Sequence, residues 1–135
     1  MTTANLYKEY RQTQITTASQ ANLILMMYEG AMRFTRQALD SLDAQDPAGM
    51  VRNIQKARDI VNELSLSLDI SQGGEAAARL ESLYQFTLSQ LTLANIKTDR
   101  APLEAVLRVL TPLTSAWQTV AEGQTEEAPL TPAKF

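Results

Sequence analysis

The chain has 135 residues, of which 44% are apolar and 20% charged, and its formal net charge is −3. This length suits one domain, and the apolar content is enough to build a core without disulfides. Cysteine and histidine are both absent, which excludes thiolate and imidazole metal sites and Ser-His-Asp triads. The negative charge argues against nucleic acid, and no apolar run reaches the length of a membrane span. Together with the lack of a recognisable signal peptide, these features predict a cytoplasmic, non-catalytic domain.

Residues 1–18 are mostly polar, and we expect them to form an arm that is partly helical at most. Tyr7, Tyr10 and Ile15 are spaced so that a loosely helical arm can present them on one side. The segment that follows is apolar nearly all round in its first half, which indicates that it needs a cover. We therefore expect the arm to act as a lid. The alternative is that both tyrosines are permanent core residues.

Four segments with helical periodicity follow the arm, and we expect them to form an all-α, antiparallel up-down four-helix bundle spanning 19–121. Their approximate ranges are 19–43, 47–69, 74–98 and 100–121. Asp46-Pro47 supplies an acidic N-cap and a proline at the first helical position of the second segment. Gly73-Gly74 separates the second segment from the third.

Pro112 interrupts the pattern of the fourth segment. A proline inside a helix loses one hydrogen bond and clashes with the carbonyl four residues earlier, which is that of Arg108. We therefore expect a kink or a break near Pro112. Residues 122–135 are rich in proline, glutamate and threonine, and the sequence predicts that they form a disordered tail.

A charge-free window covers residues 82–96, about four turns of the third predicted helix. A bundle helix normally carries charges on its outer face. Phe86, Leu93 and Ile96 lie off the main apolar stripe of this helix, so they belong either to a wide buried stripe or to an uncharged surface groove. Such a groove suits an amphipathic helix from a partner. The residues alone thus predict a helical interaction module and leave the partner open.

Two other functions stay open at this point. One is an enzyme with a carboxylate-ligated metal on a four-helix scaffold, although the apolar stripes contain no acid. Paired acids such as Asp59 and Glu63 are expected on exposed faces instead. The other is a generic bundle adaptor for a different secreted or regulatory protein.

A series of short motifs runs along the chain from Tyr7 to Ala121. They are Tyr7-Lys8-Glu9-Tyr10, Thr17-Ala18-Ser19-Gln20, Met27-Tyr28-Glu29-Gly30-Ala31, the stretch 56–64, Gly73-Gly74-Glu75, Leu83-Tyr84-Gln85-Phe86, the stretch 94–99 and Ala116-Trp117. In this order and spacing they resemble the FliS family of flagellar secretion chaperones. The family usually has other residues at Gln20, Glu29, Gln85 and Phe86, and a basic pair where Ser89-Gln90 stand. Contacts of the third helix are therefore expected to differ here.

The resemblance implies a bacterial cytosolic export chaperone without enzymatic activity. It implies binding of the disordered C-terminal region of flagellin, a block on premature polymerisation and delivery to the flagellar type III export gate. It implies no cofactor, nucleic acid or membrane insertion, and a free protein that is a monomer or a dimer. The residues expected to contact a partner are Tyr7, Tyr10, Ile15, Tyr28, Tyr84, Phe86, Leu93, Asn95 and Ile96.

Overall fold

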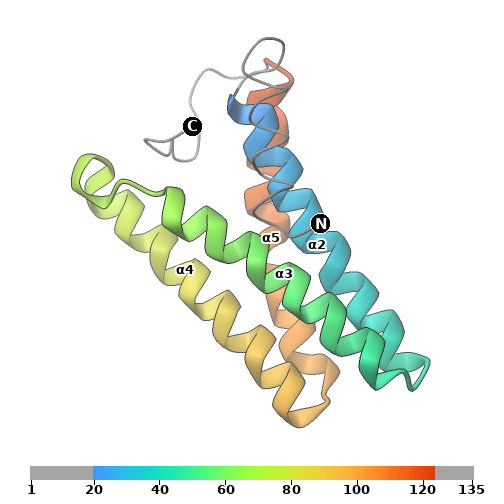
Figure 1. Cartoon of the computed structure of the whole chain (residues 1–135). Coiled ribbons are helices and arrows are strands. Elements are labelled where there is room, and N and C mark those ends of the chain that lie inside the picture. The colour runs from blue at the N-terminus through green and yellow to red at the C-terminus, as the bar shows by residue number, and fades with distance from the viewer. Residues whose placement is uncertain (1–19, 124–135) are drawn as a thin grey trace.

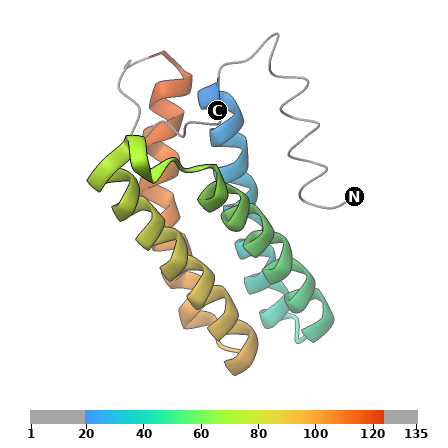
Figure 2. The same cartoon turned by 60° about the vertical axis from the view of Figure 1, so that its left-hand side comes forward.

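The computed structural model in Figure 1 describes residues 20–123. Within this range the chain forms four helices, α2 (Gln20–Asp43), α3 (Pro47–Ser67), α4 (Ile70–Lys97) and α5 (Arg100–Ala121). Consecutive helices run antiparallel, and each packs against two neighbours, so that α4 lies diagonally across the core from α2 (Figures 1 and 2). The predicted all-α four-helix bundle is confirmed. The predicted arm and all but the first two residues of the predicted tail lie outside the described residues.

Aspartate caps fix where three of these helices begin. The Asp46 carboxylate accepts the backbone N–H of Gly49 at 3.0 Å, and Pro47 takes the first helical position, as the sequence predicted. A Cβ atom on Gly49 would lie 2.3 Å from Oδ2 of Asp46, so this cap requires glycine at that position. Asp69 and Asp99 cap α4 and α5 with the same kind of side-chain bond.

The start of α4 differs from the prediction by one turn. Helical backbone begins at Ile70, directly after its Asp69 cap, rather than at the glycine pair. The backbone at Gly74 is not helical, with φ 61° and ψ −136°, and it separates this first turn from the rest of α4. Glycine is the residue that adopts such angles without strain. The glycine pair therefore marks a kink inside α4.

Helix α5 runs without a break through Pro112. The proline ring and Arg108 are both exposed, so the carbonyl that loses its helical partner lies on the side open to water. The hydroxyls of Thr111 and Thr114 donate to carbonyls one turn back, at 2.6 and 2.7 Å. The break that the sequence left open at Pro112 does not occur.

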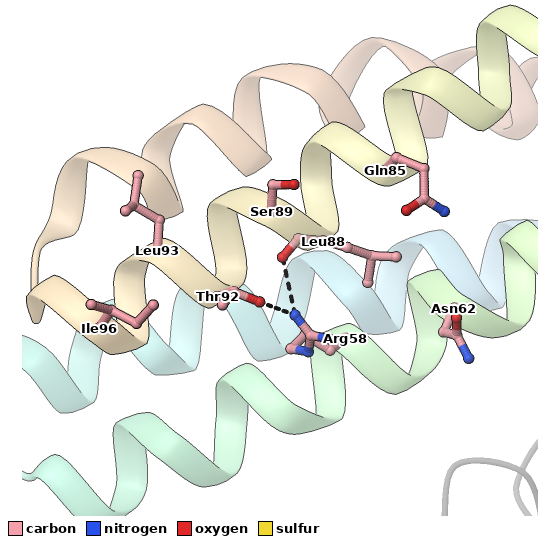
Figure 3. A pocket seen from close by; sticks show the side chains of 8 residues that line it. All are labelled: Arg58, Asn62, Gln85, Leu88, Ser89, Thr92, Leu93 and Ile96. Atoms are coloured by element: carbon pink, nitrogen blue, oxygen red, sulfur yellow. Dashed lines mark hydrogen bonds between the residues drawn. The ribbon is translucent and has the colours of Figure 1, made fainter.

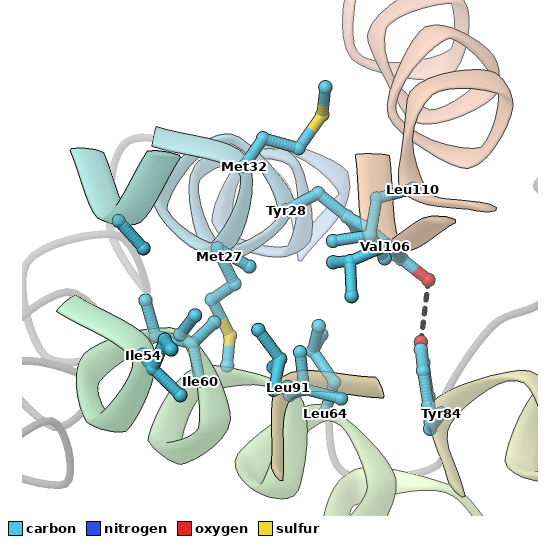
Figure 4. Packing of buried hydrophobic residues seen from close by; sticks show 14 of the residues in the cluster. Met27, Tyr28, Met32, Ile54, Ile60, Leu64, Tyr84, Leu91, Val106 and Leu110 are labelled. Carbon is cyan, nitrogen blue, oxygen red and sulfur yellow. Dashed lines mark hydrogen bonds between the residues drawn. The ribbon is translucent and has the colours of Figure 1, made fainter. Parts of the chain in front are cut away.

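The core lies between all four helices and is almost entirely apolar (Figure 4). Its fully buried large aliphatic residues are Ile24, Ile54, Val61, Leu64, Leu91, Leu103, Val106 and Leu110. The spacing of apolar residues predicts Val51 in the core-facing row of α3 with Ile54 and Ala57, but this is wrong at one position, because Val51 is 53% exposed and Met50 is buried in its place. Met50 precedes Ile54 by four residues, so it continues the core-facing row by one turn, whereas Val51 is rotated toward solvent.

Candidate partner-binding groove

A groove of about 540 Å³ runs between α3 and α4 on the outside of the bundle (Figure 3). Two of its lining residues come from α3 and six from α4. They are Arg58, Asn62, Gln85, Leu88, Ser89, Thr92, Leu93 and Ile96. The core-facing positions of α4 include Tyr84 and Leu91, so the groove is built from the positions next to them around the helix.

The lining combines apolar side chains with uncharged polar ones. Leu88, Leu93 and Ile96 supply the apolar surface, and amides and hydroxyls supply most of the rest. Ile96 is 74% exposed, which leaves an isoleucine largely open to water beside the groove. The charge-free window predicted from residues 82–96 therefore coincides with a real surface depression. Its chemistry suits the apolar face of an amphipathic helix.

Arg58 is the one charged residue among those described that lines the groove. Its side chain crosses from α3 to α4, where Nη1 donates to the carbonyl oxygen of Leu88 at 3.1 Å and to the hydroxyl of Thr92 (Figure 3). These bonds tie the two helices together and hold the guanidinium in a fixed position. The sequence reasoning did not select Arg58 or Asn62. One feature of the sequence could have indicated Arg58, because it directly follows Ala57, which is buried in the core. From that position a long side chain can reach a neighbouring helix.

Of the six predicted contact residues within 20–123, two line the groove, namely Leu93 and Ile96. Phe86 is 44% exposed but lies outside the lining. It precedes Leu93 by seven residues, so the two share one side of α4. Asn95 is half-buried and also lies outside the lining. An apolar surface on α4 thus extends beyond the groove.

Tyr28 and Tyr84 lie in the core rather than on the surface. They are 0% and 2% exposed, and their hydroxyls are 2.5 Å apart (Figure 4). Burial raises the pKa of Tyr28 to about 12 and, as the largest cause, also raises the pKa of Tyr84. A partner can touch either ring only if the core opens. The remaining predicted contacts, Tyr7, Tyr10 and Ile15, lie outside the described residues.

A metal site and a membrane-spanning helix are both absent from the described part of the chain. Residues 20–123 contain no group of three or more acidic side chains placed to hold a metal ion. None of the helices in this range is long and apolar enough to cross a membrane. Residues 20–123 thus form an all-helical bundle with a partly apolar groove on its surface.

The chain belongs to the FliS family, because residues 3–124 match the family model described as flagellar protein FliS. It is 33% identical to the flagellar secretion chaperone FliS of Campylobacter jejuni, over 88% of this chain and 93% of that protein. Identity is 31% to the Salmonella typhimurium chaperone, over 90% and 93% of the two chains, and 29% to the Bacillus subtilis chaperone, over 94% of each. These relatives are named as secretion chaperones, not as enzymes. The resemblance inferred from the motifs is confirmed.

Proposed function

We propose that this chain is a cytosolic export chaperone for flagellin. In this proposal it binds the disordered C-terminal region of flagellin, blocks premature polymerisation and delivers the cargo to the flagellar type III export gate. The observation that carries the proposal is the groove between α3 and α4, to which α4 contributes no charged side chain and along which Leu93 and Ile96 lie, in a member of a family of flagellar secretion chaperones.

The physical need for such a groove follows from the cargo. The terminal segments of flagellin are amphipathic helices that pack against other flagellin molecules, so they would associate if left free. They must also stay unfolded enough to enter a narrow export channel. A groove that covers their apolar faces and later releases them meets both requirements. Binding and release need no catalytic group.

The first test is to mix the purified chain with flagellin from the same organism and measure the mass of the product by light scattering. We expect a stable one-to-one complex with full-length flagellin and none with flagellin that lacks its C-terminal region. No complex with flagellin, combined with binding to a different secreted protein, would favour the generic adaptor. Delivery is tested by flagellin export from cells whose own copy is replaced by an Ile96→Asp variant.

The second test locates the cargo surface. Ile96→Asp, Leu93→Asp and Phe86→Asp should each weaken flagellin binding by more than about 1–2 kcal/mol, the scale of an interface anchor. Leu66→Asp is the matched control, because Leu66 is 61% exposed on α3 and does not line the groove. Melting temperatures should stay close to that of the wild type for Ile96→Asp. If that variant binds flagellin normally, the groove is not the cargo surface.

The lid belongs to the proposal on sequence grounds alone, because Tyr7, Tyr10 and Ile15 lie outside the described residues. Deleting residues 1–14 separates a lid from a core role. A lid predicts a folded bundle that self-associates through exposed apolar surface and binds flagellin with a faster association rate. A core role predicts a large fall in melting temperature. A folded truncation with unchanged association kinetics would count against the lid.

A further inference from the structure

We propose that Arg58 makes the groove selective for a helix that carries a carboxylate one turn away from an apolar side chain. The inference rests on the proposed function, because the occupant it assumes is the flagellin segment. It adds which chemical feature of that segment the groove recognises.

Arg58 has N–H donors that the described residues leave unused. A guanidinium has five N–H donors in a planar fork, and the bonds to Leu88 and Thr92 both come from Nη1. Nε and Nη2 make no hydrogen bond, and Arg58 takes part in none of the ion pairs, within residues 20–123. The ion pairs in that range use Arg79 and Arg100 instead. Arg58 therefore keeps donors for a carboxylate, the acceptor that this fork fits best.

The described lining of the groove gives Arg58 no acidic neighbour. Within residues 20–123 no acid lines the groove, although the chain as a whole has a net charge of −3. A helix that fills the groove without an acid would take the Arg58 cation out of water without giving it an ionic partner, which is unfavourable. A helix with an acid at that point gains a charge-assisted hydrogen bond. Arg58 thus favours binding of a helix that carries an acid at this point and disfavours binding of a helix without one.

The spacing of Thr92 and Ile96 along α4 sets the pattern that a bound helix must match. Arg58 bonds to Thr92, and Ile96 follows Thr92 by one helical turn, about 6 Å at 1.5 Å per residue. Figure 3 shows Thr92 and Ile96 on the same stretch of α4, with Arg58 facing Thr92. A helix lying along α4 can therefore place an acid at Arg58 and an apolar side chain, three or four residues away, against Ile96. This spacing is the pattern that we expect in the bound segment.

Arg58 also has a structural task, which is to join α3 to α4, and the variants must separate the two roles. Arg58→Gln removes the charge and the fork. Thr92→Val removes one of the two bonds that Arg58 makes to α4 but keeps the charge, so its melting temperature measures the structural role. Arg52→Gln removes a charge of the same sign from the same helix, at an exposed position outside the groove lining.

The experiment is calorimetric titration of each full-length variant with the C-terminal region of flagellin from the same organism. Arg58→Gln should weaken binding about ten- to a hundredfold, the range for a lost hydrogen bond to a charged group. Arg52→Gln should stay within about threefold of the wild type, because it does not remove the groove cation. Wild-type affinity in Arg58→Gln overturns the inference and leaves the proposed function standing. Failure of the wild-type chain to bind flagellin overturns the proposed function, and the inference with it.

A charge exchange tests the same idea from the cargo side. Each acid of the flagellin segment is replaced by its amide in turn, and one replacement should weaken binding as much as Arg58→Gln without adding to it. Lysine at that cargo position should restore at least about tenfold of the affinity lost in Arg58→Glu. If Arg58→Gln does not fold, the acid scan against the wild-type chain decides, and a scan without one sensitive acid overturns the inference.

Discussion

The hydroxyl groups of Tyr28 and Tyr84 lie 2.5 Å apart inside the bundle and connect α2 to α4 across its diagonal. In the described residues no Cα atom of α2 comes within 8 Å of a Cα atom of α4, so this bond joins two helices that are otherwise separated by core side chains (Figure 4). Within the described part of the chain, the buried Nε1 of Trp117 makes no hydrogen bond of good geometry. Its proximity to the Tyr28 hydroxyl lowers the pKa of Tyr28, against the larger effect of burial. Because both rings are buried, each hydroxyl relies on the other as its hydrogen-bond partner.

Removing one of the two hydroxyls should therefore cost more than removing both. Tyr28→Phe leaves the Tyr84 hydroxyl buried without its partner, and we expect the free energy of unfolding to fall by about 1–3 kcal/mol. Tyr84→Phe should cost less, because Trp117 remains beside Tyr28. The double variant should be at least as stable as Tyr28→Phe. Urea unfolding measures all three, and additive losses would contradict the prediction.

Stability should fall at alkaline pH because of the same pair. The pKa of Tyr28 rises from its ordinary value of 10.0 to about 12 in the folded protein. Its hydroxyl therefore loses its proton at a lower pH in the unfolded chain than in the folded one. The stabilisation is complete below pH 10 and is lost as the pH rises to 12, at up to about 1.4 kcal/mol per pH unit. Burial raises the pKa of Tyr84 in the same direction. Urea unfolding on either side of pH 10 checks the slope, and the double phenylalanine variant should flatten it.

Gly74 should resist substitution far more than the glycine beside it. Gly74→Ala forces a side chain onto a backbone with φ 61° and ψ −136°, and we expect a loss of about 1–3 kcal/mol. Gly73 has helical angles, so Gly73→Ala should be neutral or slightly stabilising. Thermal unfolding of the two variants gives the comparison. Equal melting temperatures would show that the kink is not required.

The stability cost of substituting Gly49 should depend on the Asp46 cap, whose carboxylate accepts the Gly49 N–H. A Cβ atom there would lie 2.3 Å from Oδ2 of Asp46, so Gly49→Ala should displace the capping carboxylate. Asp46→Ala alone should cost about 1 kcal/mol, the usual value of a lost N-cap. In a double-mutant cycle, Gly49→Ala should cost less when Asp46 is already alanine. A coupling energy of zero would mean that the Ser41 hydroxyl oxygen, 2.8 Å from the same Cβ position, and not the cap, sets the cost.

Local signals in the sequence were enough for the fold. The Asp46-Pro47 pair and the spacing of apolar residues depend only on neighbours in the chain. The structure agrees with the first, and with the second except at Val51 and in the first turn of α4. The off-stripe position of Ile96 is also a local property, and the structure shows it exposed.

Tertiary relationships could not be predicted in the same way. The bond between Tyr28 and Tyr84 joins residues 56 positions apart, and no periodicity within one helix shows which side chains meet across a core. The motifs placed both tyrosines among the expected contact residues, whereas the structure buries them. Arg58 was missed for the same reason, since its role depends on which helix lies opposite. Periodicity identifies a buried face but not the neighbour that covers it.

Trp117 gives this protein a built-in fluorescent reporter. It is the single tryptophan of the sequence, it is 2% exposed, and it belongs to α5 beside the Tyr28 side chain. The groove belongs to α3 and α4, so filling it should leave the indole in its apolar surroundings and its emission unshifted. Opening of the bundle should move that emission to longer wavelength. One optical signal can thus distinguish a chaperone that is occupied from one that has come apart.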